Sequence, residues 1–576
     1  MSYNNRGVLR LLYQSTRGSK KKISFEEAII KGIADDGGLY VPEHIPKVSM
    51  EFIASLADMS YAGAAAEIVK LFAENYTEQE IRDCTERAYN ERSFTAPEVT
   101  PLCALCDSGS CGGGGGVYGG SVGGSGGDNG DCSQINVMEL YHGPTAAFKD
   151  VALQLLPPML TLALQKTGVK ESIAILVATS GDTGKAALEG FRDVPGTAIL
   201  VFYPKDGVSE AQKLQMITQE GGNVAVAAVE GNFDDAQNGV KAIFGDVEAN
   251  KILREKGILL SSANSINWGR LLPQIVYYFK AYATLLKRYA IDCAEHGEQT
   301  TNIAFKNGDP ICFVVPTGNF GNILAGWYAR EMGLPVSRFI CASNSNNVLA
   351  DFINTGVYNK NRDFMVTISP AMDILISSNM ERLLFELSGR DSESVANWMK
   401  QLVRTGSYDV GGAMREKLAG LFYGGYATEV ETARAVSDTY NRYHYIIDTH
   451  TAVGMHVYSE YLKTKVAPSG EIVVLAATAS PYKFAKDVYK AINRSESAVD
   501  EIPVDDDIEY IDLLSKIGGG SCAPVPESLR DLRAKPVLHL TETKQEDMKE
   551  TALKILAALV NKSHTEGQTF DYADNN

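Results

Sequence analysis

The sequence predicts an α/β protein built on parallel sheets, on the evidence of its size, its composition and a regular alternation of strands and helices. The chain has 576 residues, of which 45% are hydrophobic and 22% charged, so it can bury more than one core. Short β-branched runs alternate with helical stretches, a pattern typical of parallel sheets covered by helices. We therefore expect two open parallel-sheet α/β domains, preceded by an N-terminal segment. The expected strands lie at residues 173–178, 198–203, 223–229, 311–315, 339–342 and 471–477.

Helices are expected between these strands and in the N-terminal segment. Their signals are acidic first turns and apolar side chains at helical spacing. They are expected at residues 25–32, 52–56, 151–156, 209–219, 268–286 and 323–330. Two consecutive prolines, Pro157 and Pro158, are expected to end the helix of residues 151–156 early, because proline removes a backbone donor. Trp268, at the start of a long amphipathic helix, is expected to pack in the core.

A glycine-rich stretch divides the chain. Of the 53 glycines, 13 lie between Gly109 and Gly130, and such a composition cannot offset the entropy lost on ordering, which predicts a flexible insertion. The expected division is an N-terminal domain at 1–100, the insertion at 101–134, a smaller α/β domain at 135–262, a larger α/β domain at 263–500, and a C-terminal extension at 501–576 that packs on the larger domain.

The cysteines near the insertion leave a second interpretation open. Cys103 and Cys106 have the Cys-x2-Cys spacing of zinc sites, and Cys111 and Cys132 are further potential ligands. Five consecutive glycines between the ligands would make such a site entropically costly to close, so we favour the flexible insertion over the metal site.

The charge balance excludes a general nucleic-acid binder. The formal net charge is −17, and binding to a polyanion requires a basic surface. No apolar run is long enough for a membrane span, and the N-terminal residues do not resemble a signal peptide. Four of the nine cysteines lie in the insertion, and the other five are scattered singly, as in a reducing compartment. A cytoplasmic protein is expected, and its oligomeric state is left open.

The loop at residues 316–322 reads PTGNFGN and lies between an expected strand and an expected helix. Its glycines let the backbone approach a ligand closely, and the helix N-terminus adds partial positive charge, so the loop suits a phosphate group. A tight strand-to-helix turn is the simpler interpretation. Asn319 and Asn322 add side-chain donors and favour the anion site.

A second loop, at residues 178–185, reads ATSGDTGK. It is not a nucleotide P-loop, because Thr179 stands where the first glycine would be and Ala186 replaces the hydroxyl that holds magnesium. What remains is a set of hydroxyl and N–H donors suited to a carboxylate or a phosphate. Helix capping by Ser180 or Asp182 is the structural alternative.

A third segment, at residues 141–150, reads YHGPTAAFKD and contains one lysine, Lys149. A single lysine is most often a solvated surface group. Beside Phe148, and together with two loops suited to anions, Lys149 suggests a residue that holds pyridoxal phosphate through a Schiff base.

The segment HGPTAAFKD, at residues 142–150, resembles the lysine signature of the threonine synthase family, whose members are fold-type II pyridoxal phosphate enzymes. This family has the tryptophan synthase β-like architecture. The resemblance covers most of the chain outside the insertion, and Ser480 replaces a histidine that is frequent in the family. Further matching segments are STRG at 15–18, ADDGGLYVPE at 34–43, NSINWGRLLPQIVYYF at 264–279, PTGNFGN at 316–322, SPAMDILISSNMERLLF at 369–385 and TASPYKF at 478–484.

The resemblance implies that O-phospho-L-homoserine and water are converted to L-threonine and phosphate, by γ-elimination and β-addition of water. It implies no metal. Lys149 would hold the cofactor and move protons on the substrate. The implied cofactor-binding residues are Lys149, Phe148, Gly318, Asn319, Phe320, Gly321, Asn322 and Thr478. The implied substrate-binding residues are Ser180, Gly181, Asp182, Thr183, Asn264, Ser265, Asn267 and Arg270, with Gln274 as a further candidate.

Other functions stay open at this point. A threonine synthase-like phospholyase that releases 2-oxobutyrate, or a serine/threonine dehydratase, would use the same cofactor. A non-catalytic protein that kept the fold is disfavoured, because Lys149 is present. His142 and His450 are expected to have structural roles, in shaping the lysine loop and in capping a helix.

Overall fold

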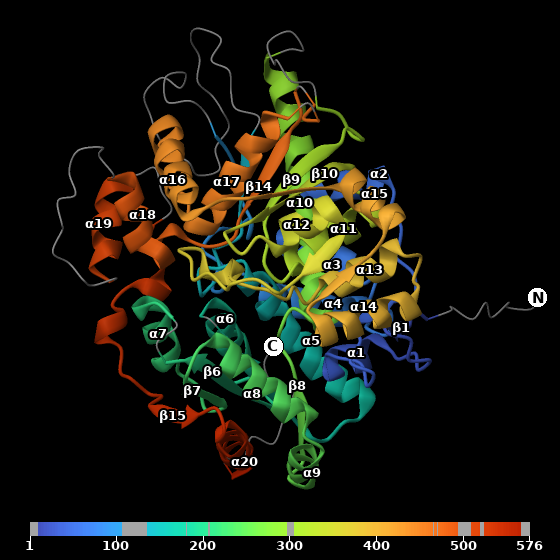
Figure 1. The fold of residues 1–576 in the computed structure, drawn as a ribbon, viewed down its shortest axis with the longest axis vertical. Helices are drawn as coiled ribbons and strands as arrows, with labels where there is room; N and C mark the ends of the chain where they lie inside the picture. The colour runs from blue at the N-terminus through green and yellow to red at the C-terminus, as the bar shows by residue number, and fades with distance from the viewer. Residues whose placement is uncertain are drawn as a thin grey trace, which may run out of the picture.

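The computed structural model describes residues 10–105, 135–179, 181–205, 208–296, 305–464, 466–468, 470–493, 508–518 and 524–565. These residues form two α/β bodies, each built on one sheet (Figure 1). No helix among them combines the length and the apolar character that crossing a membrane requires.

The larger sheet has six strands in the order β13-β10-β9-β14-β4-β3, and all neighbours are parallel except β3 with β4. Two expected boundaries are therefore wrong. β3 lies within the expected insertion at 101–134, and β4 lies within the expected smaller domain that starts at 135, yet both strands belong to the larger sheet. The strands are β3 (Leu102–Ala104), β4 (Ile135–Glu139), β9 (Ile311–Pro316), β10 (Val336–Ser343), β13 (Phe422–Tyr426) and β14 (Val473–Ala477). The physical reason is long-range pairing, since Ile135 lies opposite Val473.

The smaller sheet has five strands in the order β15-β7-β6-β5-β8, and all are parallel. Three of them match expected strands. The strands are β5 (Ser172–Ala178), β6 (Thr197–Pro204), β7 (Val224–Glu230), β8 (Ile258–Ser261) and β15 (Thr541–Lys544). β5 and β6 are buried almost throughout, as strands covered on both faces must be.

The sequence led us to expect that the C-terminal extension packs on the larger body. In the structure it packs on both bodies. Helix α19 (Glu509–Gly518) packs on α18 (Ala485–Ile492) of the larger body. The chain then crosses over, so that β15 pairs with β7 and α20 (Met548–Thr565) covers the smaller sheet (Figure 1). Met548 and Leu556 are buried in the core of the smaller body, and this apolar burial holds α20 there.

The N-terminal elements pack on α5 and α10, next to both bodies. Trp268, the first residue of α10, is fully buried against Tyr13, Phe72 and Tyr328, so the expected core role is confirmed. The N-terminal elements are β1 (Tyr13–Ser15), α1 (Phe25–Lys31), β2 (Tyr40–Pro42), α2 (Met50–Ser55), α3 (Tyr61–Val69) and α4 (Glu78–Ala88).

Further helices and one short ribbon complete the fold. They are α5 (Lys149–Thr167), α6 (Asp182–Phe191), α7 (Glu210–Ile217), α8 (Phe233–Gly245), α9 (Val247–Glu255), α10 (Trp268–His296), α11 (Gly321–Met332), α12 (Val348–Thr355), α13 (Met380–Leu387), α14 (Ser392–Thr405), α15 (Gly412–Leu421), α16 (Glu429–Tyr443), α17 (Thr449–Leu462) and the antiparallel pair β11 (Val357–Asn359) and β12 (Ser407–Asp409).

Helix α5 runs through Pro157 and Pro158, so the expected early end of this helix is wrong. Pro157 leaves the carbonyl of Leu153 without its helical N–H partner. Helix α6 packs against this position through Gly190, where an added Cβ would lie 2.1 Å from the Leu153 oxygen. Close helix packing and a long apolar face therefore outweigh the local cost of the prolines.

Candidate active site

The lysine loop lies at the carboxyl end of β4 and is joined to the segment that follows β14. Phe148 donates its backbone N–H to the carbonyl of Thr478 at 2.9 Å, and Ser480 donates to Ala146 at 3.0 Å. Two loops that are more than 300 residues apart in the sequence are thus held side by side. The carboxyl ends of parallel strands are where α/β proteins place their ligands.

The signature HGPTAAFKD folds around the buried carboxylate of Asp150. This carboxylate accepts hydrogen bonds from the backbone N–H of Thr145 at 2.8 Å and from its hydroxyl at 2.6 Å. A Cβ at Gly143 would lie 2.4 Å from that of Asp150, so the loop requires glycine there. Burial raises the pKa of Asp150 to about 6, although the hydrogen bonds from Thr145 lower that pKa. The loop fixes the backbone directly before Lys149.

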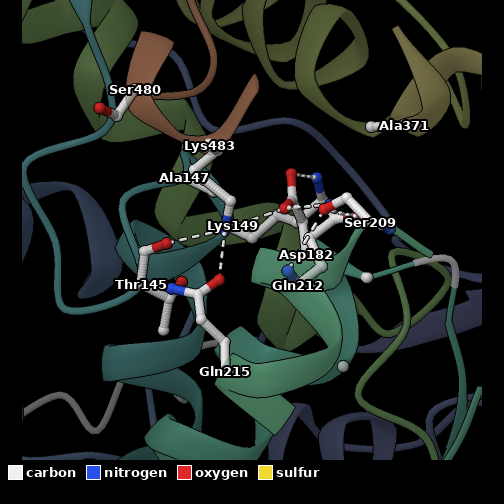
Figure 2. A network of polar contacts seen from close by, with 12 residues as sticks. Thr145, Ala147, Lys149, Asp182, Ser209, Gln212, Gln215, Ala371, Ser480 and Lys483 are labelled. Carbon is white, nitrogen blue, oxygen red and sulfur yellow. Dashed lines mark hydrogen bonds and ion pairs between the residues drawn. The ribbon is translucent and has the colours of Figure 1, made fainter. Parts of the chain in front are cut away.

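Lys149 meets two other charged side chains in the interior (Figure 2). Its Nζ donates to Asp182 Oδ2 at 3.2 Å, and Lys483 Nζ lies 2.9 Å from Asp182 Oδ1. The three residues are 8%, 4% and 3% exposed. They come from α5, α6 and the turn after β14, so this cluster joins the smaller body to the larger one.

The charges in this cluster shift one another's pKa values. Burial lowers the pKa of Lys149, and the cations of Arg270 and Lys483 lower it further, while Asp182 raises it. Burial alone would raise the pKa of Asp182, but the two lysines outweigh it and hold that pKa far below its ordinary range. Asp182 is therefore an anion at neutral pH, and Lys149 loses its proton more readily than an ordinary lysine.

Sequence reasoning missed Lys483 and two glutamines that support the cluster. Lys483 Nζ also donates to the carbonyl of Thr145 at 2.9 Å and to Gln215 Oε1 at 3.3 Å. Gln212 Nε2 donates to Asp182 Oδ1 at 3.0 Å. The available signal was the position of Lys483 inside the TASPYKF segment, five residues after Thr478.

The loop PTGNFGN lies between β9 and the N-terminus of α11, where the sequence predicted it. A Cβ at Gly318 would meet the carbonyl of Ala371 at 2.9 Å. Phe320 is buried and has a left-handed φ of 62°. Gly321 opens the helix, and Asn319 is exposed.

Asn322 completes this loop. Its side-chain oxygen accepts from the hydroxyls of Tyr277 and Tyr278, at 2.7 and 2.8 Å, while its Nδ2 is buried and has no partner among the described residues. A buried donor without an acceptor, next to a helix N-terminus, fits a phosphate group. With the buried amine of Lys149, the residues present fit pyridoxal phosphate.

The NSINWGR segment supplies the next group of predicted residues. Arg270 is 4% exposed; it donates to the carbonyl of Ala263 at 2.7 Å, and its Nε has no partner among the described residues. Burial lowers its pKa to about 10, so it stays charged. Asn264 and Ser265 are partly buried in the turn before it.

Asn267 differs from the other predicted substrate residues. Its side chain donates to the carbonyls of Ile29 and Ser262 at 2.9 and 3.0 Å, and accepts from the backbone N–H of Gly269 at 2.9 Å. These contacts attach the turn to α1. The geometry is that of a side chain that positions the turn.

The SGDTG loop begins α6. Gly181 has a φ of 133°, and a Cβ there would lie 2.4 Å from the side chain of Gln212, so this position requires glycine. Thr179 Oγ1 accepts from the backbone N–H groups of Gly181 and Gly184 at 3.0 and 2.9 Å. Thr183 is partly buried on the first turn of α6. Ser180 lies outside the described residues.

His142 has the structural contact that the sequence favoured, but the expected helix cap at His450 is wrong, because Asp448 caps α17 and accepts a hydrogen bond from the backbone N–H of His450. His142 Nε2 lies 2.6 Å from Glu139 Oε2, which ties the lysine loop to the end of β4. His450 lies on the first turn of α17; its Nδ1 lies 2.8 Å from Asp448, and its Nε2 accepts from the backbone N–H of Ala371 at 3.1 Å. Ser480, in place of the frequent histidine, caps the short turn at Tyr482.

The described part of the chain contains no cluster of three or more residues able to bind a metal. Cys103 donates its thiol to Glu139 at 3.3 Å, and burial raises its pKa. Cys106, Cys111 and Cys132, the other expected ligands of a zinc site, and the glycine-rich residues 109–130 lie outside the described residues.

Three family models match the chain in succession. Residues 12–89 match "Threonine synthase N terminus", residues 131–424 match "Pyridoxal-phosphate dependent enzyme", and residues 451–551 match "Threonine synthase, C-terminal". The insertion that the sequence analysis set apart lies almost wholly between the first two matches.

Individual relatives agree with these matches. Threonine synthase from Saccharomyces cerevisiae is 37% identical over 505 residues, which cover 84% of this chain and 89% of that protein. Human threonine synthase-like 1 is 36% identical, with 82% of this chain and 58% of that protein covered. The crystal structure of PLP-bound threonine synthase from Brucella melitensis has a TM-score of 0.75 at 32% identity and covers 95% of this chain and 99% of that chain. The chain therefore belongs to the threonine synthase family of pyridoxal phosphate enzymes.

Proposed function

We propose that this protein is a threonine synthase that converts O-phospho-L-homoserine and water to L-threonine and phosphate, with Lys149 as the residue that holds the cofactor. The observation that carries the proposal is the buried Lys149 amine, placed by the family's own signature loop where Asp182 and Lys483 meet it. When bound, pyridoxal phosphate supplies an electron sink for carbanions formed on an amino-acid substrate.

Lys149 is the proton-transfer group of this proposal. Its pKa is lowered by burial and by Arg270 and Lys483, so its amine gives up its proton more readily than that of an ordinary lysine and can act as a base. Asp182 opposes this shift and keeps the amine in place through their hydrogen bond. Lys483 in turn holds Asp182, which makes Lys483 a positioning residue.

The cofactor's phosphate is assigned to the loop of Gly318, Asn319, Phe320, Gly321 and Asn322. The N-terminus of α11 and the unpartnered Nδ2 of Asn322 support this assignment. The hydroxyl of Thr478 is assigned to the ring nitrogen, because Thr478 is bonded through its carbonyl to Phe148, next to Lys149. Phe148 lies beside the amine, with Lys149 Nζ 4.9 Å from its ring centre.

The substrate's phosphate is assigned to Arg270, with Asn264 and Ser265. Arg270 is a buried cation whose Nε has no partner among the residues that the structure describes, and its charge lowers the pKa of Lys149. A charged hydrogen bond of this kind is worth about 1.5–3 kcal/mol. Asn267 is assigned a positioning role, because its polar atoms are occupied by backbone groups.

The substrate's carboxylate is assigned to the backbone N–H groups of Gly181, Asp182 and Thr183 in the N-terminal turn of α6, while the anionic side chain of Asp182 stays with the two lysines. A helix N-terminus attracts a carboxylate, and Thr179 already orders the turn through two hydrogen bonds.

We place the protein in the cytoplasm, which the singly scattered cysteines support.

Replacing Lys149 by alanine tests the central assignment. We expect the visible absorbance of the bound cofactor to be lost and turnover of O-phospho-L-homoserine to fall by at least about a thousandfold. Lys31→Ala, on the exposed end of α1, is the matched control and should leave both unchanged. Unchanged absorbance with retained turnover in Lys149→Ala would refute the assignment.

A further inference from the structure

A polar cavity of about 570 Å³ is lined by residues of the lysine loop, of the smaller body and of the C-terminal extension. Its lining includes Tyr141, Lys185, Gln215 and Ser480. One wall is residues 524–535, which are fixed by the buried side chains of Leu529 and Leu532. The other walls are the loop after α4 and the exposed end of α6.

This cavity carries an excess of positive charge in a protein whose net charge is −17. Three acidic side chains line it, Glu189, Glu220 and Glu527. Five cationic side chains line it: Arg92, Lys185, Arg192, Arg530 and Lys535. Such a local excess in an acidic protein attracts anions to one place.

Three of these cations have no acidic partner among the described residues. Lys185 and Arg192 both pair with Glu189, at 3.3 and 3.2 Å. Arg92, Arg530 and Lys535 form no ion pair there. Burial lowers the pKa of Lys185, Glu189 opposes this shift, and the positive charges of Lys535 and Lys483 lower the pKa further. The cations therefore repel one another, and a bound anion would relieve this repulsion.

Gln215 supplies a second, independent sign of a ligand. It is 1% exposed and lines the cavity, and its Nε2 is buried with no partner among the described residues. Its Oε1 accepts from Lys483, so the amide nitrogen is the end that is left to donate. Buried donors are rarely left without an acceptor.

We propose that this cavity is a binding site for an organic phosphate, separate from the catalytic cleft. Arginine forks and a lysine amine match phosphate oxygens. The volume exceeds that of a bare phosphate ion, and Tyr141, Pro524 and Pro526 provide apolar walls for the rest of the ligand. The site lies one side chain, Gln215, away from Lys483 and the catalytic cluster.

Isothermal titration of the cofactor-loaded enzyme with pyrophosphate tests this proposal. The double variant Arg530→Gln/Lys535→Gln removes two unpaired cations from the C-terminal wall, and Arg92→Gln removes one from the opposite wall. We expect each of these two variants to weaken the binding of pyrophosphate at one site by at least about tenfold, because each loses charged hydrogen bonds to the phosphate oxygens. A tenfold loss corresponds to about 1.4 kcal/mol. Lys516→Gln/Lys544→Gln is the matched control, because it makes the same charge change outside the cavity.

Turnover measurements on the same variants distinguish this cavity from the catalytic cleft, that is, from the residues assigned to the cofactor and the substrate. We expect both cavity variants to keep the parent's turnover of O-phospho-L-homoserine at saturating substrate. Equal pyrophosphate affinity in parent and cavity variants would overturn the proposal, as would an equal loss in the control variant, which would indicate nonspecific charge attraction. Loss of turnover in a folded cavity variant would also overturn it, because the cavity would then belong to the cleft.

Discussion

Replacing Lys483 by methionine tests whether the buried charge cluster holds the two bodies together. Lys483 and Asp182 are almost fully buried, with Nζ and Oδ1 2.9 Å apart. At an effective dielectric constant of about 20, two unit charges at this distance attract by about 6 kcal/mol. Removing one partner of a buried pair typically costs about 3–5 kcal/mol. Because Lys149 and Gln212 still contact Asp182, we expect the low end, about 3 kcal/mol.

Urea-induced unfolding, followed by tryptophan fluorescence, measures this loss. The pKa of Asp182 is held below its ordinary value of 3.8, so its contribution is fully present above about pH 4 and is lost as the pH falls further. Measurements at pH 7 should therefore show the whole effect. Lys31→Met, which removes an exposed pair with Asp35, should cost less than about 1 kcal/mol. A loss for Lys483→Met as small as that of the control would refute the reasoning.

Three further predictions follow from the same geometry. Lys483 lowers the pKa of Lys149, so Lys483→Met should move the acidic limb of the kcat/KM profile to higher pH; an unmoved limb would contradict this electrostatic role. Gly181→Ala should lower kcat/KM by at least about tenfold, because its Cβ meets a side chain at 2.4 Å, whereas Gly168→Ala, with open space around it, should not. Arg270→Gln should raise KM for O-phospho-L-homoserine by at least about tenfold, measured by steady-state kinetics, and an unchanged KM would remove Arg270 from the phosphate site.

The strands and anion loops could be predicted because their signals are local. The run at residues 311–315 and the loop PTGNFGN that follows it are continuous in the sequence; β9 lies where the sequence placed it, and α11 begins at Gly321, two residues before the expected helix. The lysine signature is equally local. It singled out Lys149 beside Phe148, and in the structure Lys149 is buried with its Nζ 4.9 Å from the centre of the Phe148 ring.

The errors concern contacts between distant segments. The domain boundary at residue 135 failed because β4 pairs with β14, more than 300 residues later. The C-terminal extension was assigned to the larger body, since no local pattern shows that β15 pairs with β7. Lys483 was missed for the same reason: only folding brings it to Asp182. The continuation of α5 through its prolines was missed as well, and there α6 packs closely on α5 through Gly190, a contact that no local pattern shows.

Product analysis of the wild-type enzyme tests the central claim most directly. Purified, cofactor-loaded protein is supplied with O-phospho-L-homoserine, and threonine, phosphate and 2-oxobutyrate are quantified in the same samples. A threonine synthase with Lys149 at its centre should release threonine and phosphate in equal amounts, with little 2-oxobutyrate. Phosphate accompanied by 2-oxobutyrate and no threonine would contradict the account and identify a phospholyase.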